Sequence, residues 1–360
     1  MTLIIAEAGV NHNGDENLAI ELVRQAKKAG ADIVKFQTFK AKSGVSRSAE
    51  QADYQEKNTG KKESQLDMVS RLELSFEAHK LLVEECENLG IEFLSTAFDH
   101  ESLEFLVYEL GLKRLKIPSG EITNAPLVLA HARTGCDIIL STGMASLTDI
   151  ETVLGIIAFG FTAPLDEEPT LEKFKSAYFS AEGQVALRNK VVVLHCTTEY
   201  PAPIKDINLK AMDTIADSFK LRVGYSDHSS GIAVSLAAAA RGAEVIEKHF
   251  TLDKNMDGPD HKASIEPEEL TSMVASIREI NACLGDGLKG PRPSELKNMS
   301  IARKSIVAKD KILKGDKFSH QNLTIKRPGT GISPLRYWDL IGKTSKSEIR
   351  PDELVKVEDY

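Results

Sequence analysis

One pattern repeats along most of this sequence: a helical stretch with an apolar face, often followed by glycine, precedes a short run of β-branched residues that ends in polar side chains. In its first full instance, Asp15 can cap a helix, Gly30 ends it, and a run at 32–38 follows. Such runs predict eight strands, at residues 3–6, 32–38, 91–95, 114–119, 137–142, 190–197, 222–227 and 245–250. Further helical periods lie at 76–89, 100–110, 124–134, 147–159, 206–219, 230–241 and 267–284. Eight strands that alternate with helices predict a parallel (β/α)8 barrel, and an open doubly wound sheet is the alternative because periodicity does not show whether a sheet closes.

The chain is longer than such a barrel requires, since its 360 residues exceed the roughly 250 of a typical barrel domain. We assign residues 1–285 to the barrel and residues 286–305, which contain Gly, Pro and Ser, to a linker. Residues 306–360 contain short alternating runs with Gly-Asp and Pro-Gly turns, which predict a small β-rich domain. A stretch of this size forms a marginal core by itself, so we expect it to pack on the barrel or on a second subunit.

Two insertions interrupt the repeat. Residues 40–70 are polar and follow the second strand directly, so we expect a loop or lid at the C-terminal face of the barrel. Residues 161–189 enlarge a connection from a helix to a strand, with one short helix expected after Pro169. That connection lies on the opposite side from a barrel's chemistry, which predicts a surface embellishment.

Composition limits the partners and the compartment. The net charge of −8 argues against a nucleic-acid or acidic-membrane partner. The four cysteines stand singly, without CxxC spacing, which fits a reducing compartment. The N-terminus does not resemble a signal peptide, and no run approaches the roughly 18 apolar residues that a membrane span needs. We expect a cytoplasmic protein.

Two histidines follow neighbouring predicted strands. His228 ends the run at 222–227, and His249 lies at the end of the run at 245–250. The C-terminal ends of neighbouring parallel strands lie side by side, so both imidazoles can face one pocket and hold a divalent metal. Alternatively, each histidine only caps its strand and bonds to the backbone. From this stretch alone, both interpretations stand.

Polar side chains gather at this predicted edge of the barrel, the two histidines among them. They are Glu7, Lys35, Gln37, Ser95, Thr96, Lys116, Ser119, Glu121, Thr142, Thr197, Thr198, Tyr200, Ser226, Asp227, His228 and His249. Lysines in a barrel mouth lose solvation unless an anion is present, and hydroxyls are suitable donors to carboxylate or phosphate oxygens. Each lysine taken singly is more simply read as a solvated surface group. Their joint placement predicts a small polyanion bound beside a metal.

Nine motifs resemble those of the bacterial sialic acid (nonulosonic acid) synthases. They are AEAGVNHNG (6–14), VKFQTF (34–39), FLSTAFD (93–99), KIPSGEI (116–122), ILSTGMA (139–145), LHCTTEYP (194–201), GYSDH (224–228), IEKHFTLDK (246–254) and GPDHKAS (258–264). The stretch KRPGTGISP (326–334) is similar to that family's C-terminal antifreeze-like (SAF) module. The resemblance therefore covers the whole chain and implies a TIM barrel followed by a small SAF domain of the β-clip type.

The resemblance implies a reaction and roles for individual residues. It implies condensation of phosphoenolpyruvate with the open-chain aldehyde of an N-acetylated hexosamine, dependent on Mn²⁺ or Mg²⁺, to give a nine-carbon α-keto acid and phosphate. His228 and His249 would be the metal ligands, and Glu7 or Glu121 would shuttle a proton. Phosphoenolpyruvate would contact Lys35, Thr96, Lys116, Ser119 and Ser226, and the sugar would contact Gln37, Tyr200 and Asp260 beside the two glutamates. Arg327 would reach the sugar from the partner subunit, which implies a domain-swapped homodimer.

One departure from the family pattern concerns residues 197–200. Thr197 and Thr198 stand where some members have asparagine, which puts one phosphate contact, here assigned to Thr198, and the sugar preference in doubt. N-acetylmannosamine would give N-acetylneuraminate, the product that we favour at this point. The alternative acceptor is 2,4-diacetamido-2,4,6-trideoxymannose, which would give N,N'-diacetyllegionaminate. A further alternative is a synthase that acts on a phosphorylated aldose, against which the SAF-like tail argues. Another is a non-enzymatic carbohydrate- or ice-binding protein, against which the barrel motifs argue.

Overall fold

The structure is a computed structural model that describes residues 1–60 and 62–360; Lys61 and the side chains of Tyr54 and Lys57, all within the insertion at 40–70, lie outside the described part. The chain divides into two compact units, Met1–Gly285 and Asp286–Tyr360. Each unit has its own hydrophobic core.

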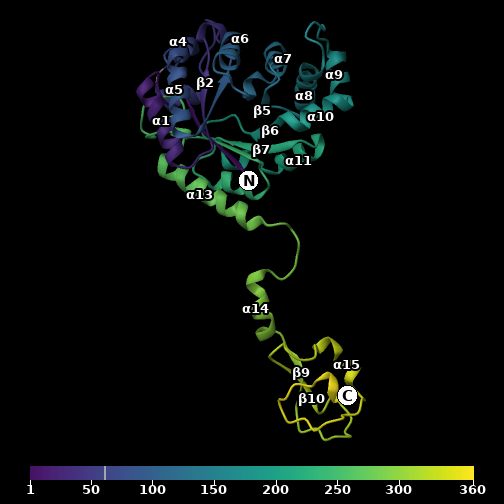
Figure 1. The fold of residues 1–360 in the computed structure, drawn as a ribbon. Coiled ribbons are helices and arrows are strands. Elements are labelled where there is room, and N and C mark those ends of the chain that lie inside the picture. Colours follow the sequence, from purple (N-terminus) through teal and green to yellow (C-terminus); the bar gives the residue numbers. More distant parts are fainter. Residues whose placement is uncertain (61) are drawn as a thin grey trace. The chain divides into compact units, whose positions relative to one another are not determined.

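The first unit is a closed barrel of eight parallel strands with helices around it (Figure 1). In chain order the strands are β1 (Leu3–Gly9), β2 (Ile33–Thr38), β3 (Glu92–Ala97), β4 (Arg114–Ile117), β5 (Asp137–Ser141), β6 (Val191–Cys196), β7 (Arg222–Asp227) and β8 (Val245–His249). The barrel closes where β8 pairs with β1, from Leu3 opposite Val245 to Glu7 opposite His249. This closure confirms the predicted (β/α)8 barrel and excludes the open sheet.

The helices form where the apolar period predicts them. They are α1 (Glu16–Lys28), α5 (Phe76–Leu89), α6 (His100–Glu104), α7 (Ala125–Arg133), α8 (Leu147–Thr162), α11 (Lys210–Phe219), α12 (Ala233–Ala240) and α13 (Pro267–Leu284). The Asp15 carboxylate caps α1 by accepting the N–H groups of Asn17 and Leu18. Gly30 follows at φ +84°, a left-handed conformation that favours glycine and ends the helix.

Two local differences from the expected elements have physical causes. Strand β4 ends at Ile117 because Pro118 cannot donate to the sheet, and Ser119–Glu121 form one turn of 3-10 helix. The helix expected at 100–110 is divided, since α6 passes into a π-helical turn over Phe105–Glu109. Stacking of Phe105 against Phe76 of α5, with ring centroids 3.9 Å apart, anchors that turn.

The alternating side chains of each strand separate the barrel's floor from its mouth. Inward-facing apolar residues near the strand starts form one cluster, Ile5, Ile33, Leu94, Ile139, Val192, Leu194 and Val245. Two positions later on the same faces come polar residues, such as Glu7 after Ile5 and Lys35 after Ile33. The apolar interior of the barrel therefore lies beneath a polar layer, and this polar layer is the floor of a cavity at the mouth of the barrel.

The insertion at 40–70 folds into three short helices, α2 (Ala41–Gly44), α3 (Asp53–Thr59) and α4 (Gln65–Ser70). Its middle is tied to the loop after β8. The Asn58 amide donates to the Pro259 carbonyl at 2.8 Å, and Lys262 Nζ donates to the Asn58 carbonyl at 2.8 Å. The segment therefore joins the β2 side of the mouth to the β8 side.

The insertion at 161–189 contains more helix than expected. It forms α9 (Leu171–Phe179) and most of α10 (Ala181–Lys190). Phe174 of α9 packs edge-on against Phe159 of α8, with ring centroids 5.3 Å apart, so the insertion extends the outer helical layer.

The second unit contains helix α14 (Pro293–Ala302) within the stretch expected as a linker. Strands β9 (Ser305–Ala308) and β10 (Leu323–Lys326) pair antiparallel, and α15 (Tyr337–Leu340) follows. Their core is small and consists of Ile306, Ala308, Ile312, Phe318, Leu323, Ile332, Leu340, Ile349 and Val355. In both units, residue 61 aside, no helix has the length and apolar character of a membrane span.

Candidate active site

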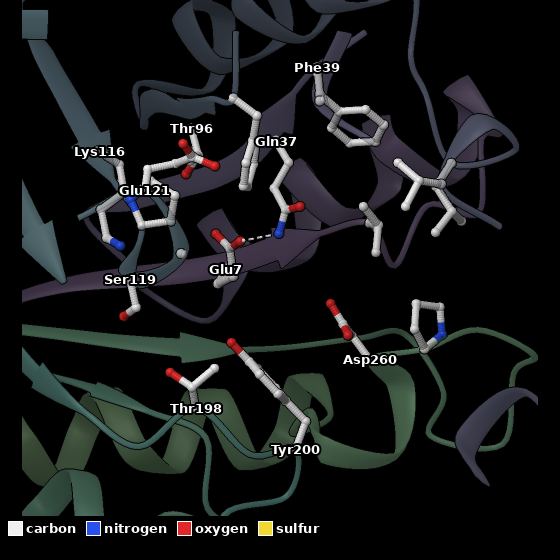
Figure 2. Close-up of a pocket in the computed structure, with 18 of the residues that line it drawn as sticks. Glu7, Gln37, Phe39, Thr96, Lys116, Ser119, Glu121, Thr198, Tyr200 and Asp260 are labelled. Carbon is white, nitrogen blue, oxygen red and sulfur yellow. Dashed lines mark hydrogen bonds between the residues drawn. The ribbon is translucent and has the colours of Figure 1, made fainter. Parts of the chain in front are cut away.

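A cavity of about 390 Å³ opens at the C-terminal mouth of the barrel (Figure 2). Every residue to which the resemblance assigns a role, except Arg327, lines it, whereas Ser95, Thr142, Thr197 and Asp227, which were expected at the same edge, do not. The residues with an assigned role that line it are Glu7, Lys35, Gln37, Thr96, Lys116, Ser119, Glu121, Thr198, Tyr200, Ser226, His228, His249 and Asp260. They come from seven strands or from the loops that follow them, which is the arrangement that parallel strand ends dictate.

Four charged groups form the deepest layer of the cavity. Lys35 Nζ lies 2.7 Å from Glu7 Oε2 and 3.5 Å from Glu247 Oε2. Lys116 Nζ lies 3.6 Å from Glu247 Oε1 and donates to Ser141 Oγ at 2.8 Å. All four side chains are almost fully buried. Two cations thus share two carboxylates in a site with little water.

Burial and proximity alter the acidity of these groups. Burial raises the pKa of Glu7 to about 7, against the lowering effect of Lys35. Burial also acts to raise the pKa of Glu247, but the charges of Lys116 and Lys35 outweigh it and lower that pKa. Burial lowers the pKa of Lys116, and Glu247 offsets this only in part. The raised pKa of Glu7 favours its protonated form, which leaves Glu247 as the carboxylate between the two lysines and suits an anionic ligand.

Two residues of this layer are absent from the predicted set. Glu247 accepts a hydrogen bond from Ser226 Oγ at 2.8 Å and faces inward two residues before His249 on the same strand. Ser141 faces inward two residues after Ile139, whereas the neighbouring Thr142 is buried and donates to the Leu194 carbonyl at 2.9 Å. Strict alternation along the strands would have selected both.

The loops after β4, β5 and β6 meet at Ser119. Its Oγ accepts the Gly143 N–H at 2.9 Å and lies 3.1 Å from Cys196 Sγ. A side chain at position 143 would place its Cβ 2.2 Å from Thr198 Oγ1, so only glycine permits this approach. The Thr198 hydroxyl is buried and has no hydrogen-bond partner among the described residues, so a ligand is a suitable partner for it.

The two histidines lie close together. The ring centroids of His228 and His249 are 5.5 Å apart, and the Tyr200 ring lies 4.2 Å from His228 and 5.6 Å from His249. Burial lowers the pKa of His228 to about 4 and that of His249 well below its ordinary value. Both rings are therefore neutral near pH 7, the form in which imidazole binds metal ions.

The hydrogen bonds of the pair test the two interpretations of the histidines. His228 Nδ1 donates to the Thr197 carbonyl at 2.7 Å, which leaves Nε2 as the nitrogen with the lone pair. His249 Nδ1 is buried and has no hydrogen-bond partner among the residues described, and Asp260 Oδ2 lies 3.8 Å from it. The interpretation that each histidine only bonds to the backbone explains the hydrogen bonding of one nitrogen of His228 and of neither nitrogen of His249.

These donors fit a divalent ion that takes two ligands from the protein. Within residues 1–60 and 62–360, no group of three or more His, Cys, Asp or Glu side chains is placed to hold a metal. An ion bound by His228 and His249 would complete its shell from substrate and water. Because the protein would supply only these two ligands, the ion would keep coordination positions that a substrate oxygen can occupy.

Three further residues line the sides of the cavity. The carboxylate of Asp260 has its pKa raised to about 6 by burial. Glu121, on the 3-10 turn after β4, accepts a hydrogen bond from Asn124 Nδ2 at 2.7 Å. Gln37 Nε2 donates to Glu7 Oε1 at 3.3 Å. In Figure 2, Gln37 and Glu7 lie between Lys116 and Ser119 on one side and Asp260 on the other.

Arg327 belongs to the second unit and is not among the residues that the cavity brings together. Its side chain is exposed, and Nε donates to the Ala302 carbonyl at 3.1 Å. Its role in a partner subunit remains a prediction.

A buried ion pair supports the two histidine loops from behind. Lys248 Nζ lies 3.2 Å from Asp227 Oδ2, and both side chains are fully buried. The other oxygen of Asp227 accepts the N–H of Ser229 at 2.8 Å, and Lys248 also donates to the Ser229 carbonyl. The pair therefore fixes the residues that flank His228 and precede His249.

We expect Lys248→Met to lower the free energy of unfolding by about 3–5 kcal/mol, because it leaves the Asp227 carboxylate buried without its cation. Urea unfolding followed by circular dichroism measures this loss. The exposed pair of Lys220 with Asp217, at 3.5 Å, provides the control, and Lys220→Met should cost less than about 1 kcal/mol. Equal losses for the two variants would show that the buried pair does not stabilise the barrel.

Comparisons with known proteins agree with this geometry. The NeuB family model matches residues 22–289, and the SAF domain model matches residues 303–360. The N,N'-diacetyllegionaminic acid synthase of Campylobacter jejuni is 53% identical, over 99% of this chain and 99% of its own length. The enzyme of the same name from Legionella pneumophila is 47% identical, over 94% of this chain and 89% of its own. The crystal structure of N-acetylneuraminic acid (sialic acid) synthetase from Leptospira borgpetersenii is 35% identical, covers 82% of this chain and 90% of its own, and has a TM-score of 0.65.

These similarities confirm the predicted family. The two legionaminic acid synthases have higher sequence identity to this chain than the sialic acid synthetase has. The chain belongs to the NeuB family of nonulosonic acid synthases and carries a SAF domain at its C-terminus.

Proposed function

We propose that this protein condenses phosphoenolpyruvate with 2,4-diacetamido-2,4,6-trideoxymannose to give N,N'-diacetyllegionaminate and inorganic phosphate. The observation that carries the proposal is the layered cavity, in which two buried lysines lie at the floor and two neutral histidines lie beside them. The identity of 53% with a legionaminic acid synthase supports the choice of sugar.

In the proposed reaction, carbon 3 of phosphoenolpyruvate attacks the aldehyde carbon of the open-chain sugar. Water adds to carbon 2, and phosphate leaves with cleavage of its bond to that carbon. Lys35 and Lys116 would bind the phosphate and carboxylate groups, with the hydroxyls of Thr96, Ser119 and Ser226 as further donors. Their charges would hold the substrate with carbon 3 facing the open part of the cavity.

The remaining residues would position the sugar and move a proton. Glu7 is buried 2.7 Å from Lys35, and its pKa of about 7 suits a group that accepts a proton from the attacking water. Asp260 and Tyr200 would bind sugar hydroxyls on the β6 and β8 side of the mouth. A divalent ion held by His228 and His249, Mn²⁺ or Mg²⁺, would supply Lewis-acid stabilisation of the aldehyde oxygen.

Product formation from purified components tests the proposal. Incubation with phosphoenolpyruvate, Mn²⁺ and the diacetamido sugar should release phosphate and form a nine-carbon acid that mass spectrometry identifies. Absence of phosphate release with this sugar and with N-acetylmannosamine, under Mn²⁺ and Mg²⁺, would favour the non-enzymatic carbohydrate-binding alternative.

We expect Lys35→Met and Lys116→Met each to raise the KM for phosphoenolpyruvate by about 10- to 100-fold, with a smaller change for the sugar. Each variant removes a charge-assisted contact worth roughly 1.5–3 kcal/mol. Steady-state kinetics with each substrate varied in turn measures both constants. Lys205→Met, at an exposed position outside the cavity, is the control. A larger effect on the sugar than on phosphoenolpyruvate would contradict the placement of the anion.

A further inference from the structure

Along three neighbouring strands, β1, β2 and β3, the side chains that line the cavity change from charged or polar at its floor to apolar at its mouth. Inward positions on β2 run from Lys35 through Gln37, and Phe39 follows just past the strand end. On β3 the corresponding step leads from Thr96 to Phe98, and on the β1 side Val10 follows the strand that carries Glu7. Charged groups therefore occupy the floor, and the mouth above β1, β2 and β3 is mainly apolar, although Lys40, with its Nζ 3.2 Å from Glu73 Oε1, also lines it.

The insertion at 40–70 completes this apolar surface. We call it the apolar wall; it consists of Val10, Phe39, Val45, Met68, Leu72 and Phe98, all of which line the cavity. Val10, Phe39 and Leu72 form one hydrophobic cluster, with Phe98 packed against it. The Phe39 and Phe98 rings pack edge-on with centroids 6.2 Å apart, so the wall is built before any ligand arrives.

The opposite side of the mouth is polar. Tyr200 and Asp260 line it from the loops after β6 and β8, and Figure 2 shows Phe39 across Gln37 from Lys116 and Ser119. The insertion adds two amides to the cavity lining, Gln55 and Gln65. A sugar bound at this mouth therefore contacts polar side chains, which can bind its hydroxyl and amide groups, on some sides and the apolar wall on another.

We infer that the apolar wall is the specificity element of the sugar site and receives the deoxygenated carbon 6 of the acceptor. The inference rests on the proposed function, which puts phosphoenolpyruvate on the lysines and the sugar's aldehyde beside the histidines. The other end of the sugar's carbon chain then points from the floor to the mouth. A methyl group at carbon 6 packs favourably on the wall. The hydroxyl of a hydroxymethyl group at the same place would leave water for an apolar surface, which costs free energy. The amides of Gln55 and Gln65 suit the acetamido group at carbon 4.

Four acceptors separate the contributions of carbons 4 and 6. They are 2,4-diacetamido-2,4,6-trideoxymannose, its 6-hydroxy counterpart, N-acetylmannosamine and 6-deoxy-N-acetylmannosamine. For each pair that differs only at carbon 6, kcat/KM should favour the 6-deoxy sugar by about 10- to 100-fold, the range that a single apolar group in a pocket provides.

Two wall variants test whether the wall causes this preference. Met68→Gln keeps the length of the side chain but adds an amide, and Val45→Thr replaces a methyl group by a hydroxyl at a half-buried position. Each should reduce the 6-deoxy preference to about threefold or less while the KM for phosphoenolpyruvate stays unchanged. Met68→Leu should keep the preference, and Leu171→Gln on the exposed side of α9 should change neither quantity. Val45→Thr is the safer variant for folding if Met68→Gln is unstable.

The outcomes distinguish the inference from the function on which it rests. Turnover without preference at carbon 6, or a preference that both folded wall variants retain, overturns the inference and leaves the synthase function intact. If the wall variants lose only the discrimination between substituents at carbon 4 and keep the preference at carbon 6, the assignment of carbon 6 to the wall is overturned. No product from any of the four sugars overturns the proposed function and the inference with it.

Discussion

Alanine in place of either His228 or His249 should lower kcat by roughly 10³-fold or more while the barrel remains folded, because a metal bound by two protein ligands cannot lose one and keep its position. The two rings lie 5.5 Å apart by their centroids, and among the described residues no group of three or more His, Cys, Asp or Glu side chains is placed to hold the ion in their stead. Neither ring contributes to the hydrophobic core clusters, so we expect only a small change in stability.

Three measurements check this expectation. Calorimetric titration with Mn²⁺ should detect binding to the parent and much weaker binding to both variants, and EDTA should reproduce their loss of turnover. His100→Ala, at an exposed position at the start of α6, should behave like the parent in each assay. Full activity of the chelated protein, or parent-like Mn²⁺ affinity in either variant, would contradict the metal assignment.

Glu7→Gln is the second substitution with a large expected effect, a decrease in kcat of about 10²- to 10⁴-fold. Glu7 is buried beside Lys35, and burial raises its pKa to about 7, so it can both accept and release a proton near neutral pH. Glutamine preserves the shape and the hydrogen-bonding capacity of the side chain but cannot carry the proton. The effect should therefore appear in kcat with little change in the KM for the sugar.

Glu121→Gln is the matched comparison, because Glu121 also lines the cavity but lies on a half-buried turn with Asn124 bonded to its carboxylate. We expect it to lose less activity than Glu7→Gln. A larger loss for Glu121→Gln would transfer the proton shuttle to that residue.

The sequence predicts the barrel well because the alternation of strand and helix is a local property. The Asp15 cap, the Gly30 stop and the strand runs each depend on a few neighbouring residues. Closure is different, since it depends on the pairing of β8 with β1 across more than 200 residues, and no local pattern encodes it.

All but one of the residues assigned a site role line one cavity, their roles stay predictions, and the omissions and wrong inclusions have a common cause. The prediction chose polar residues because they stand at the end of a strand. In the structure, a residue lines the cavity only if its side chain is on the inward face of the strand. Thr142 was therefore included although it bonds to a neighbouring strand, and Ser141 and Glu247 were omitted although they line the cavity. The apolar wall escaped prediction because apolar residues such as Met68 and Leu72, in and just after a polar insertion, resemble ordinary packing residues until the fold places them over the cavity.

The most direct test of the proposed reaction is a competition in which the protein receives phosphoenolpyruvate, Mn²⁺ and equal concentrations of N-acetylmannosamine and 2,4-diacetamido-2,4,6-trideoxymannose. Mass spectrometry identifies the acid formed, and released phosphate is measured in the same sample. We expect N,N'-diacetyllegionaminate as the main product, in an amount equal to the phosphate released. N-acetylneuraminate as the main product would contradict the proposed acceptor, and a mixture that yields neither acid nor phosphate would contradict the proposed synthase.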